Sequence, residues 1–270
     1  MLSYIHWDVS PEIVSIGPLS LRWYGLLFAT GFLIGLFMVQ RMFKEENAPE
    51  EWLDKCFIYI VLGAVIGARL GHVFFYDWDY YSQNLGEIPM IWKGGLASHG
   101  GAIGIIIAMW IFSVRVTKKS MLWILDKVVV PTALAGCFIR LGNLMNSEIL
   151  GKPADVAWAF VFERVDEVPR HPVQIYESIT YLIIFFVLYR LYWRTTAKEK
   201  PGFLFGMFLI LIWGARFFLE YFKASQGGFE TVVGQALTTG QLLSIPFVLI
   251  GLYFVLRDTG HKIEKRKPKI

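Results

Sequence analysis

Residues 136–151, GCFIRLGNLMNSEILG, combine an apolar run with side chains that can bind an anion or orient a substrate. Within nine residues this stretch contains Arg140, Asn143, Asn146 and Glu148. A charged side chain at the centre of a membrane helix costs about 2.5–3.5 kcal/mol, so such groups usually line a cavity or a pathway. An arginine binds phosphate oxygens bidentately. The stretch therefore predicts one wall of an active or binding site.

A continuous helix does not explain the whole stretch. At 100° per residue Arg140 and Asn143 share a face, whereas Asn146 lies about 120° away. We expect the helix to end here, with Gly142 and Gly151 as breaks and the polar groups turned inward. Irregular backbone at membrane depth is tolerated where it lines a cavity or is buried in protein.

Other apolar runs also contain polar side chains. Arg216 and Glu220 are four residues apart, so a helix places them side by side, either as a structural ion pair or as part of a ligand site. His99 stands in SHGG, where glycines allow close approach, and its ordinary pKa near 6.5 suits proton transfer. A satisfied polar histidine at a helix end is the alternative.

Two further clusters lie near the ends of apolar runs. Arg69 and His72 are three residues apart and can share a helix face. Gln174 and Glu177 lie one turn apart, just after a proline that suits a helix start. Interfacial snorkelling or capping explains each cluster as well as a functional role does.

The composition places these polar residues in a membrane protein. Of 270 residues 55% are hydrophobic and 18% are charged, and the mean hydropathy is +0.49. That is too apolar for a disordered chain or an ordinary soluble domain. A bilayer core of ~30 Å takes about 20 helical residues to cross. Seven apolar runs are long enough, near 21–41, 56–76, 95–114, 121–142, 173–193, 203–222 and 239–257. We predict an all-α integral membrane protein with seven transmembrane helices in one polytopic domain, residues 1–270.

Two kinds of residue within these runs affect how the helices form and pack. Pro131 and the polar end that follows interrupt the fourth run. Glycines recur at four-residue spacing in the first three runs, for example at Gly63, Gly67 and Gly71. Small residues at this spacing allow close helix packing, which is explanation enough for them.

The basic residues predict the topology. Sixteen of the 26 lysines and arginines lie in the loops after the first, third and fifth runs and in the C-terminal tail, against six in the other loops. Cytoplasmic loops are enriched in Lys and Arg, so we expect the N-terminus outside and the C-terminus in the cytoplasm. The run 156–165 predicts a short strand pair or hairpin, and hence a small extracytoplasmic cap at about residues 143–172.

Composition and spacing also exclude some functions. The pI near 8.9 reflects loop charges of a membrane topology, not a nucleic-acid-binding face. Cys56 and Cys137 form no CxxC pattern, and the five histidines are scattered, so we expect no disulfide framework and no metal site. The N-terminal segment lacks a basic region before its first long apolar run, so we expect it to be retained rather than cleaved as a signal peptide.

At these residues the sequence resembles the bacterial prolipoprotein diacylglyceryl transferase family over essentially the whole chain. Each motif alone is weak, but their order across seven spans is specific. The motifs are RWYG at 22–25, GARLG at 67–71, GGLASHGG at 94–101, RLGNLMNSE at 140–148, HPVQIYE at 171–177, Arg216 with Glu220, and GQLLSIP at 240–246.

The resemblance implies a reaction. The diacylglyceryl group of phosphatidylglycerol moves to the lipobox cysteine thiol of a prolipoprotein; a thioether forms at the glycerol carbon and glycerol phosphate leaves. The substrate supplies the nucleophile, and no cofactor is implied. The implied location is the bacterial inner membrane, with the active site toward the extracytoplasmic side. The partners implied are the lipid, the signal peptide of the prolipoprotein and the bilayer, without nucleic acid.

The resemblance also implies the site residues. Arg140 and Arg216 would hold the phosphate, and His99 or a carboxylate would accept the thiol proton. Asn143 and Glu148 would orient headgroup hydroxyls. The remaining implied positions are Tyr24 and Glu220 in catalysis and Asn146, Gly151, Arg69 and Glu177 in substrate binding. Ile212 stands where the family has a tyrosine, so no hydroxyl is supplied there.

Two other functions fit the same residues. Another phospholipid headgroup transferase would use the arginines without a protein thiol. A lipid transporter or flippase would use the buried charges as a pathway, but the sequence has no internal repeat and its polar motifs gather near one interface.

Overall fold

The computed structural model describes residues 4–17, 19–224 and 237–257. They form two compact units: unit 1 takes the residues up to 35 together with those from 126 onward, and unit 2 takes residues 36–125. The chain passes between the units within two of its helices. The basic tail beyond residue 257, predicted to be cytoplasmic, lies outside the described residues.

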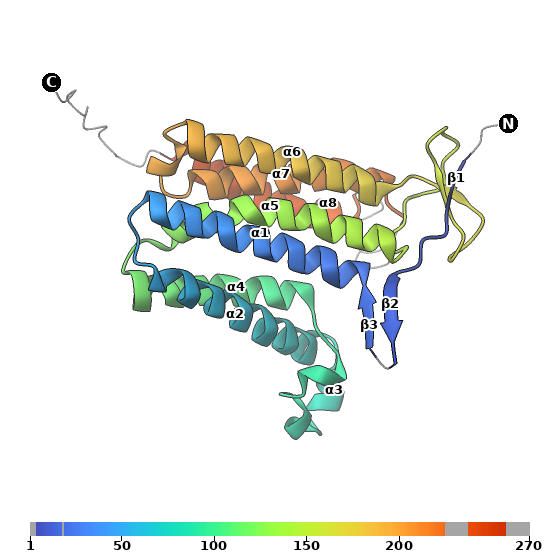
Figure 1. The fold of residues 1–270 in the computed structure, drawn as a ribbon, viewed down its shortest axis with the longest axis horizontal. Helices are drawn as coiled ribbons and strands as arrows, with labels where there is room; N and C mark the ends of the chain where they lie inside the picture. Colours follow the sequence, from blue (N-terminus) through green and yellow to red (C-terminus); the bar gives the residue numbers. More distant parts are fainter. Residues whose placement is uncertain (1–3, 18, 225–236, 258–270) are drawn as a thin grey trace. The chain divides into compact units, whose positions relative to one another are not determined.

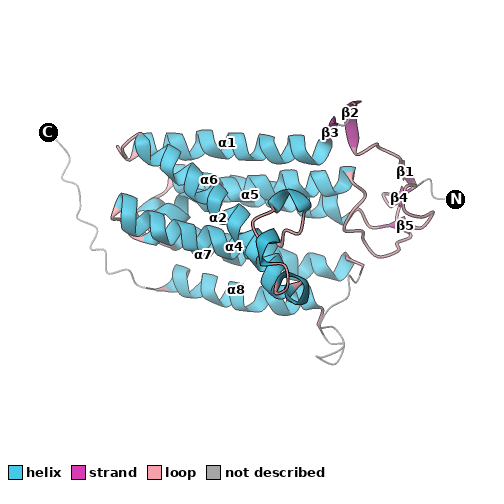
Figure 2. Ribbon diagram, turned by 90° about the horizontal axis from the view of Figure 1, so that it is seen from below, coloured by secondary structure: helices cyan, strands magenta, loops and turns pink. Residues whose placement is uncertain are grey.

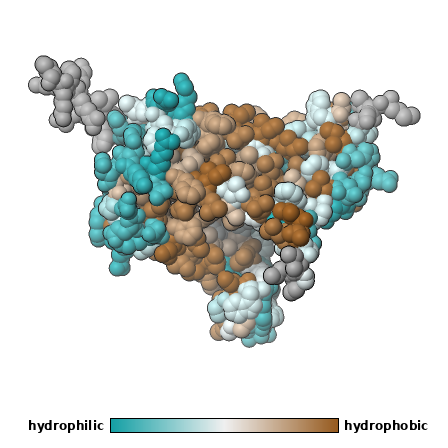
Figure 3. Space-filling view, viewed as in Figure 1, coloured by the Kyte–Doolittle hydropathy of each residue, from teal (hydrophilic) through white to brown (hydrophobic). Residues whose placement is uncertain are grey.

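Seven helices of the described chain are long and apolar enough to cross a membrane, as predicted. Figures 1 and 2 show them as the dominant elements, and Figure 3 shows their apolar surface in brown. They are α1 Trp23–Glu45, α2 Glu51–Phe75, α4 Ser98–Phe112 with the π-helical turn η3 Ser113–Thr117, α5 Met121–Met145, α6 Val173–Arg194, α7 Phe203–Leu219 with the 3-10 turn η5 Glu220–Phe222, and α8 Thr239–Leu256.

In unit 1, helix α5 continues through Pro131, so the predicted interruption of the fourth span is wrong. The proline ring lies opposite Gly35 of α1, where a β-carbon would come within 3.2 Å of the proline Cβ. One turn earlier along α1, Gly31 faces Ala135 in the same way. Gly31 and Gly35 therefore let α1 pack closely against α5. The proline removes one helical hydrogen bond, which membrane helices tolerate, and α5 stays a single helix up to Met145.

Two small sheets complete unit 1. The strands are β1 Ile5–Trp7, β2 Glu12–Ile16, β3 Leu19–Arg22, β4 Phe160–Phe162 and β5 Pro169–Arg170, and a 3-10 turn, η4, spans Ala197–Glu199. Strand β4 pairs in parallel with β1 and antiparallel with β5, whereas β2 and β3 form a hairpin directly before α1. The run 156–165 thus contains one strand, β4, and the prediction of a strand pair or hairpin within it is wrong. Turns bound β4 on both sides, so its partners come from elsewhere in the chain.

The three-stranded sheet packs against the end of α5 and is hydrogen-bonded to it. Leu144, Phe160 and Phe162 form a buried cluster, and Trp7 and Ile175 pack against it. The indole nitrogen of Trp7 also donates a hydrogen bond of 3.1 Å to the carbonyl oxygen of Leu144. This carbonyl group, one of the last of α5, also accepts a hydrogen bond of 3.0 Å from the backbone N–H of Ser147, so strand β1 and the turn after α5 meet at one atom.

An ion pair closes the turn between β4 and β5. Asp166 Oδ2 lies 2.5 Å from Arg170 Nη2, and the backbone N–H of Val168 donates to Asp166 Oδ1. The hydrogen bond from Arg170 holds the pKa of the Asp166 carboxyl below its ordinary value of 3.8.

This lowered pKa predicts a pH dependence of stability. Because the folded-state pKa is below the unfolded one, the contribution is present above about pH 4 and is lost as the pH falls through the folded value. Thermal unfolding should therefore distinguish wild type from Asp166→Asn at neutral pH and bring them together in acid. A difference that persists unchanged in strong acid would contradict this prediction.

In unit 2, helices α2 and α4 pack through their glycines, as the four-residue spacing predicted. A β-carbon built on Gly67 would lie 2.8 Å from the Cα of Gly104, and one on Gly71 would lie 2.7 Å from the Cα of Gly100. The backbones therefore touch directly. Short elements connect the two helices: α3 Trp78–Tyr81 and the 3-10 turns η1 Leu85–Glu87 and η2 Ile91–Lys93.

We expect Gly67→Ala to lower the free energy of unfolding by about 1–3 kcal/mol, because backbone atoms of α4 leave no space for the methyl group. Gly214→Ala in α7 is the matched control, since nothing lies within 4 Å of a β-carbon there. Thermal unfolding in detergent checks both variants. If the two variants unfold at the same temperature, α2 and α4 can move apart to admit the methyl group at no cost in stability, and the prediction is wrong.

Candidate functional site

The end of α5 holds a connected set of polar side chains in unit 1. Arg140 Nη1 donates to Asn143 Oδ1 over 3.3 Å, and Asn143 Nδ2 donates to Glu148 Oε2 over 3.2 Å. Asn146 Nδ2 donates to the other carboxylate oxygen, Oε1, over 3.1 Å. Because α5 ends at Met145, Asn146 can turn back to meet Glu148, as the predicted helix end requires.

The turn after α5 is backbone-strained. Ser147 and Ile149 have φ angles of 55° and 56°, a left-handed conformation that is costly for a β-branched residue. Gln174 of α6 is fully buried, and its Nε2 donates to the carbonyl oxygen of Glu148 over 2.6 Å. Strain of this kind persists only where the surroundings impose it, and it concentrates at functional sites.

Tyr24 lies against the same helix end. A β-carbon on Gly142 would come within 2.7 Å of the Tyr24 ring, so the absence of a side chain there admits the ring. Gly142 lies inside α5 and does not break it, contrary to prediction.

Glu177 forms ion pairs with two basic side chains of the site. Its side chain is 1% exposed, and Oε2 lies 2.9 Å from Arg140 Nε while Oε1 lies 3.0 Å from Lys223 Nζ. Arg140 is thus held from two directions, by Glu177 and by Asn143. A buried carboxylate with two cationic partners positions those cations, and its predicted contact with substrate stays a prediction.

Arg216 of α7 differs from the other cations of the site. Its guanidinium carbon lies 4.8 Å from the centre of the Trp213 ring, which itself stacks on Phe247 of α8 at 4.2 Å. Nε is buried, and among the described residues it has no hydrogen-bond partner and the side chain has no carboxylate within ion-pair distance. The aromatic stack therefore holds a partly buried guanidinium that has no anionic partner among the described residues.

Glu220 does not pair with Arg216, although helical spacing makes them neighbours. Its Oε2 lies 3.5 Å from Lys223 Nζ. Its carboxylate also lies against Gly240 at the start of α8, where a β-carbon would come within 2.7 Å of Oε2. Negative charge is favourable at the first turn of a helix. The structural ion pair considered for Arg216 and Glu220 is thus replaced by one with Lys223.

Gly151 lies where two strands of backbone meet. It forms a β-bridge with Lys223, and Lys152 N–H donates to Phe222 O over 2.8 Å. A β-carbon at Gly151 would collide with the carbonyl oxygen of His171. Because Gly151 has no side chain, the segment after α5 can contact the residues at the end of α7 and those just before α6 at the same point.

In unit 2, Arg69 organises the loop between α2 and α4. It is 3% exposed, and its guanidinium donates to the carbonyl oxygens of Glu87, Ile88, Gly94 and Gly95. The Tyr81 ring lies 4.8 Å from its guanidinium carbon. All three nitrogens are thus engaged by backbone, and the predicted contact of Arg69 with substrate stays a prediction.

His99 begins α4 in unit 2. Its Nε2 lies 2.7 Å from the hydroxyl oxygen of Tyr76, and the two rings are 5.6 Å apart. The His72 ring stacks on Tyr76, with the ring centres 6.0 Å apart. The hydrogen bond fixes the orientation of the His99 ring.

The predicted site set omitted two residues that the structure places among the buried charges. Lys223, 8% exposed, bridges Glu177 and Glu220, and fully buried Gln174 holds the strained turn. Lys223 follows Arg216 by seven residues and Glu220 by three, so helical spacing could have placed it on their face. For Gln174 the signal was its position one turn before Glu177.

The arrangement suits an anion rather than a metal ion. Within the described ranges no group of three or more His, Cys, Asp or Glu residues could hold a metal. Arg140 and Arg216 offer planar donors that match phosphate oxygens, and Glu148 with its two amides offers polar groups for hydroxyls.

The fold and this buried polar site define a multi-pass helical membrane protein. Comparison with known families sharpens that class: the sequence model of the family described as Prolipoprotein diacylglyceryl transferase matches residues 11–257. The chain belongs to this family.

The chain is also similar to individual proteins of known name. It is 48% identical over 258 residues to a protein of Tolumonas auensis, covering 96% of this chain and 99% of that one. It is 48% identical over 256 residues to a protein of Chloroherpeton thalassium, covering 95% of each. It is 43% identical over 277 residues to a protein of Porphyromonas gingivalis, covering 98% of each. All three relatives are named phosphatidylglycerol–prolipoprotein diacylglyceryl transferase.

Proposed function

We propose that this chain is a transferase that moves the diacylglyceryl group of phosphatidylglycerol to prolipoproteins. Its near full-length relatives carry that activity in their names. The structural observation that carries the proposal is Arg216, a partly buried cation stacked on Trp213, with a buried Nε and no anionic partner among the described residues. A lipid phosphate supplies that anion.

The two arginines have different parts in the reaction. Arg216 binds the phosphate and stabilises the negative charge that builds on the leaving glycerol phosphate. Arg140 contributes a second guanidinium, whose direction is set by Glu177 and Asn143. Because these groups are fixed before the lipid arrives, they need no reorganisation during the reaction.

The acceptor is the lipobox cysteine of the prolipoprotein. Its sulfur attacks the glycerol carbon, a C–S bond forms as the C–O bond to phosphate breaks, and glycerol phosphate leaves with the electron pair. The two cysteines of this chain are free and buried, in keeping with a nucleophile that comes from the substrate. Glu148, with Asn143 and Asn146, orients the headgroup hydroxyls, and Tyr24 contacts the lipid beside Gly142.

The thiol must lose a proton, since the thiolate is the nucleophile. His99 is one acceptor, oriented by Tyr76, and a carboxylate of the buried cluster is the other. The pH profile of turnover with His99→Gln discriminates them. If His99→Gln removes the acid limb of the profile, where turnover rises as the general base loses its proton, the acceptor is His99, whereas an unchanged profile assigns the proton to a carboxylate.

The activity is tested with purified protein, phosphatidylglycerol and a lipobox peptide. Mass spectrometry should find a peptide heavier by one diacylglyceryl group and an equal amount of released glycerol phosphate. A peptide that stays unmodified, although a known transferase modifies it with the same lipid, would refute the proposal. Release of glycerol phosphate without any peptide would indicate a headgroup enzyme of another kind.

The proposed orientation places the N-terminus and the site on the extracytoplasmic side of the bacterial inner membrane. The distribution of Lys and Arg supports it. The sheet of β1, β4 and β5 then belongs to the extracytoplasmic cap proposed for about residues 143–172, within a single membrane domain.

This orientation predicts which engineered thiols are accessible. Ser82 and Ser120 are both exposed, and the native cysteines are buried. A membrane-impermeant maleimide applied to spheroplasts should label Ser82→Cys at once and Ser120→Cys only after lysis. The reverse pattern would invert the topology.

A further inference from the structure

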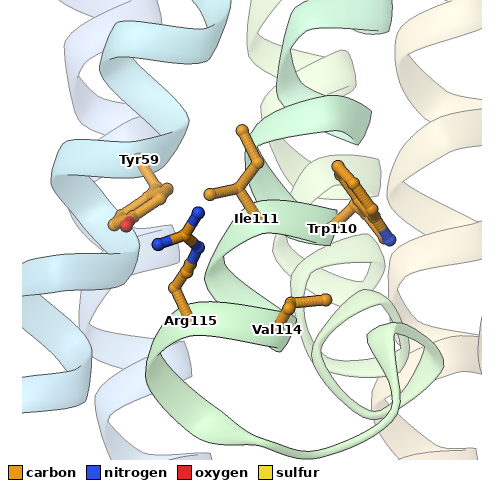
Figure 4. Close-up of a pocket in the computed structure, with 5 residues that line it drawn as sticks. All are labelled: Tyr59, Trp110, Ile111, Val114 and Arg115. Carbon is orange, nitrogen blue, oxygen red and sulfur yellow. The ribbon is translucent and has the colours of Figure 1, made fainter.

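Unit 2 contains a cavity that none of the predicted site residues lines. It has a volume of about 580 Å³ and lies between α2 and the end of α4 (Figure 4). Its lining residues are Tyr59, Trp110, Ile111, Val114 and Arg115. Arg115 follows His99 by sixteen residues, about 24 Å along the helical rise. The cavity is therefore at the opposite end of unit 2 from His99.

The polar part of the cavity can bind an anion. Figure 4 shows the guanidinium of Arg115 turned toward the ring of Tyr59. Among the described residues neither the guanidinium nor the Tyr59 hydroxyl has a hydrogen-bond or carboxylate partner. Nearby Lys119, in contrast, lies over the Trp123 ring at 4.3 Å. Arg115, which has no such contact among the described residues, is thus free to bind a ligand.

The backbone that carries Arg115 is unusual. It belongs to the π-helical turn Ser113–Thr117, which ends at Lys118 with a φ of 56°. Ser113 Oγ donates to the carbonyl oxygen of Lys119 over 2.6 Å, and Thr117 Oγ1 donates to Ser113 O over 3.3 Å. Single π-helical turns occur frequently at functional sites. These hydroxyls hold the turn from which Arg115 reaches the cavity.

The apolar part of the cavity indicates a lipid rather than a soluble anion. Trp110 and Val114 are 56% and 49% exposed, and Ile107, one turn earlier on α4, is 51% exposed. They belong to a helix that is long and apolar enough to cross a membrane, so this apolar surface suits acyl chains. Basic pockets between membrane helices are typical sites for anionic lipid headgroups.

We propose that this cavity binds one anionic phospholipid, in addition to the lipid consumed in the reaction. The phosphate accepts hydrogen bonds from the Arg115 guanidinium and the Tyr59 hydroxyl, and an acyl chain lies along Trp110 and Val114. The site uses no residue of the cluster around Glu177, so its loss leaves the chemistry intact.

Native mass spectrometry of the full chain in detergent tests this proposal. The probes are dioleoyl phosphatidic acid, which is anionic but has no glycerol headgroup to release, and zwitterionic dioleoyl phosphatidylcholine. We expect phosphatidic acid to bind more tightly than phosphatidylcholine, and Arg115→Gln to weaken about tenfold the binding of one phosphatidic acid beyond any held by Arg140 and Arg216. Ile111→Trp should fill the cavity and exclude the lipid with Arg115 in place. Diacylglyceryl transfer should persist in both variants.

The matched control is Arg190→Gln, which removes an exposed arginine near the end of α6. Equal weakening by the Arg115 and Arg190 substitutions, or none by either Arg115→Gln or Ile111→Trp, would overturn the proposal. Displacement of the lipid by millimolar inorganic phosphate would overturn it as well, since the site would then bind free anions. Because transfer is measured separately, failure here is distinguishable from failure of the proposed activity.

Discussion

Replacing Arg216 with alanine is expected to lower diacylglyceryl transfer about 10²–10³-fold, the usual cost of removing one fixed donor to developing charge. The change should leave membrane insertion and thermal unfolding nearly unchanged, because no ion pair within the described protein is broken. Transfer to a lipobox peptide under saturating phosphatidylglycerol, followed by mass spectrometry, measures the effect.

Three variants sharpen this prediction. Arg216→Lys should recover only part of the activity, because a lysine cannot bind two phosphate oxygens in a planar fork. Arg190→Ala, on an exposed surface of α6, should keep full activity. Arg140→Ala should lose most turnover while still inserting, but it also frees Glu177, so activity and stability should fall together. Full activity of Arg216→Ala would remove this arginine from the phosphate site.

Glu177→Gln is expected to destabilise the protein by about 3–5 kcal/mol, the range for breaking a buried ion pair. The carboxylate is 1% exposed and neutralises both Arg140, at 2.9 Å, and Lys223, at 3.0 Å. Glutamine keeps the shape but leaves Arg140 without a carboxylate partner among the described residues and Lys223 with Glu220 as its remaining one. Thermal unfolding in detergent should show a lower midpoint, and transfer activity should fall because Arg140 loses one of its two restraints.

The control for this prediction is the exposed pair of Glu51 and Lys55. Their charged atoms lie at a similar distance of 2.9 Å, but the side chains are 66% and 45% exposed. Glu51→Gln should cost no more than about 0.5 kcal/mol. Similar losses in Glu51→Gln and Glu177→Gln would show that burial does not amplify the Glu177 interactions.

The membrane spans could be predicted because length and hydropathy are properties of each segment by itself. Length and hydropathy alone determine which segments can cross a bilayer, and the glycine spacing in α2 marked the face that meets α4. Pro131 misled because a proline inside a membrane helix can remove one backbone hydrogen bond without ending the helix. The partners of β4 come from residues 5–7 and 169–170, and no pattern within 156–165 contains that pairing.

In the candidate site, too, contacts within one short segment could be predicted, whereas contacts between distant segments could not. The end of α5 and its turn were readable, because Arg140, Asn143 and Glu148 interact within nine residues. The role of Glu177 was not, because its partners come from two other helical segments. Arg216 and Glu220 showed the limit of spacing rules: helical geometry makes them neighbours, yet Glu220 takes Lys223 instead.

The central claim is that Arg216 and Arg140 hold the phosphate of phosphatidylglycerol. An experimental structure of the protein with this lipid bound tests it most directly. We expect phosphate oxygens at about 2.7–2.9 Å from the guanidinium nitrogens of both arginines, as in charge-assisted hydrogen bonds. A phosphate bound elsewhere, with Arg216 paired to a carboxylate of the protein, would contradict the account.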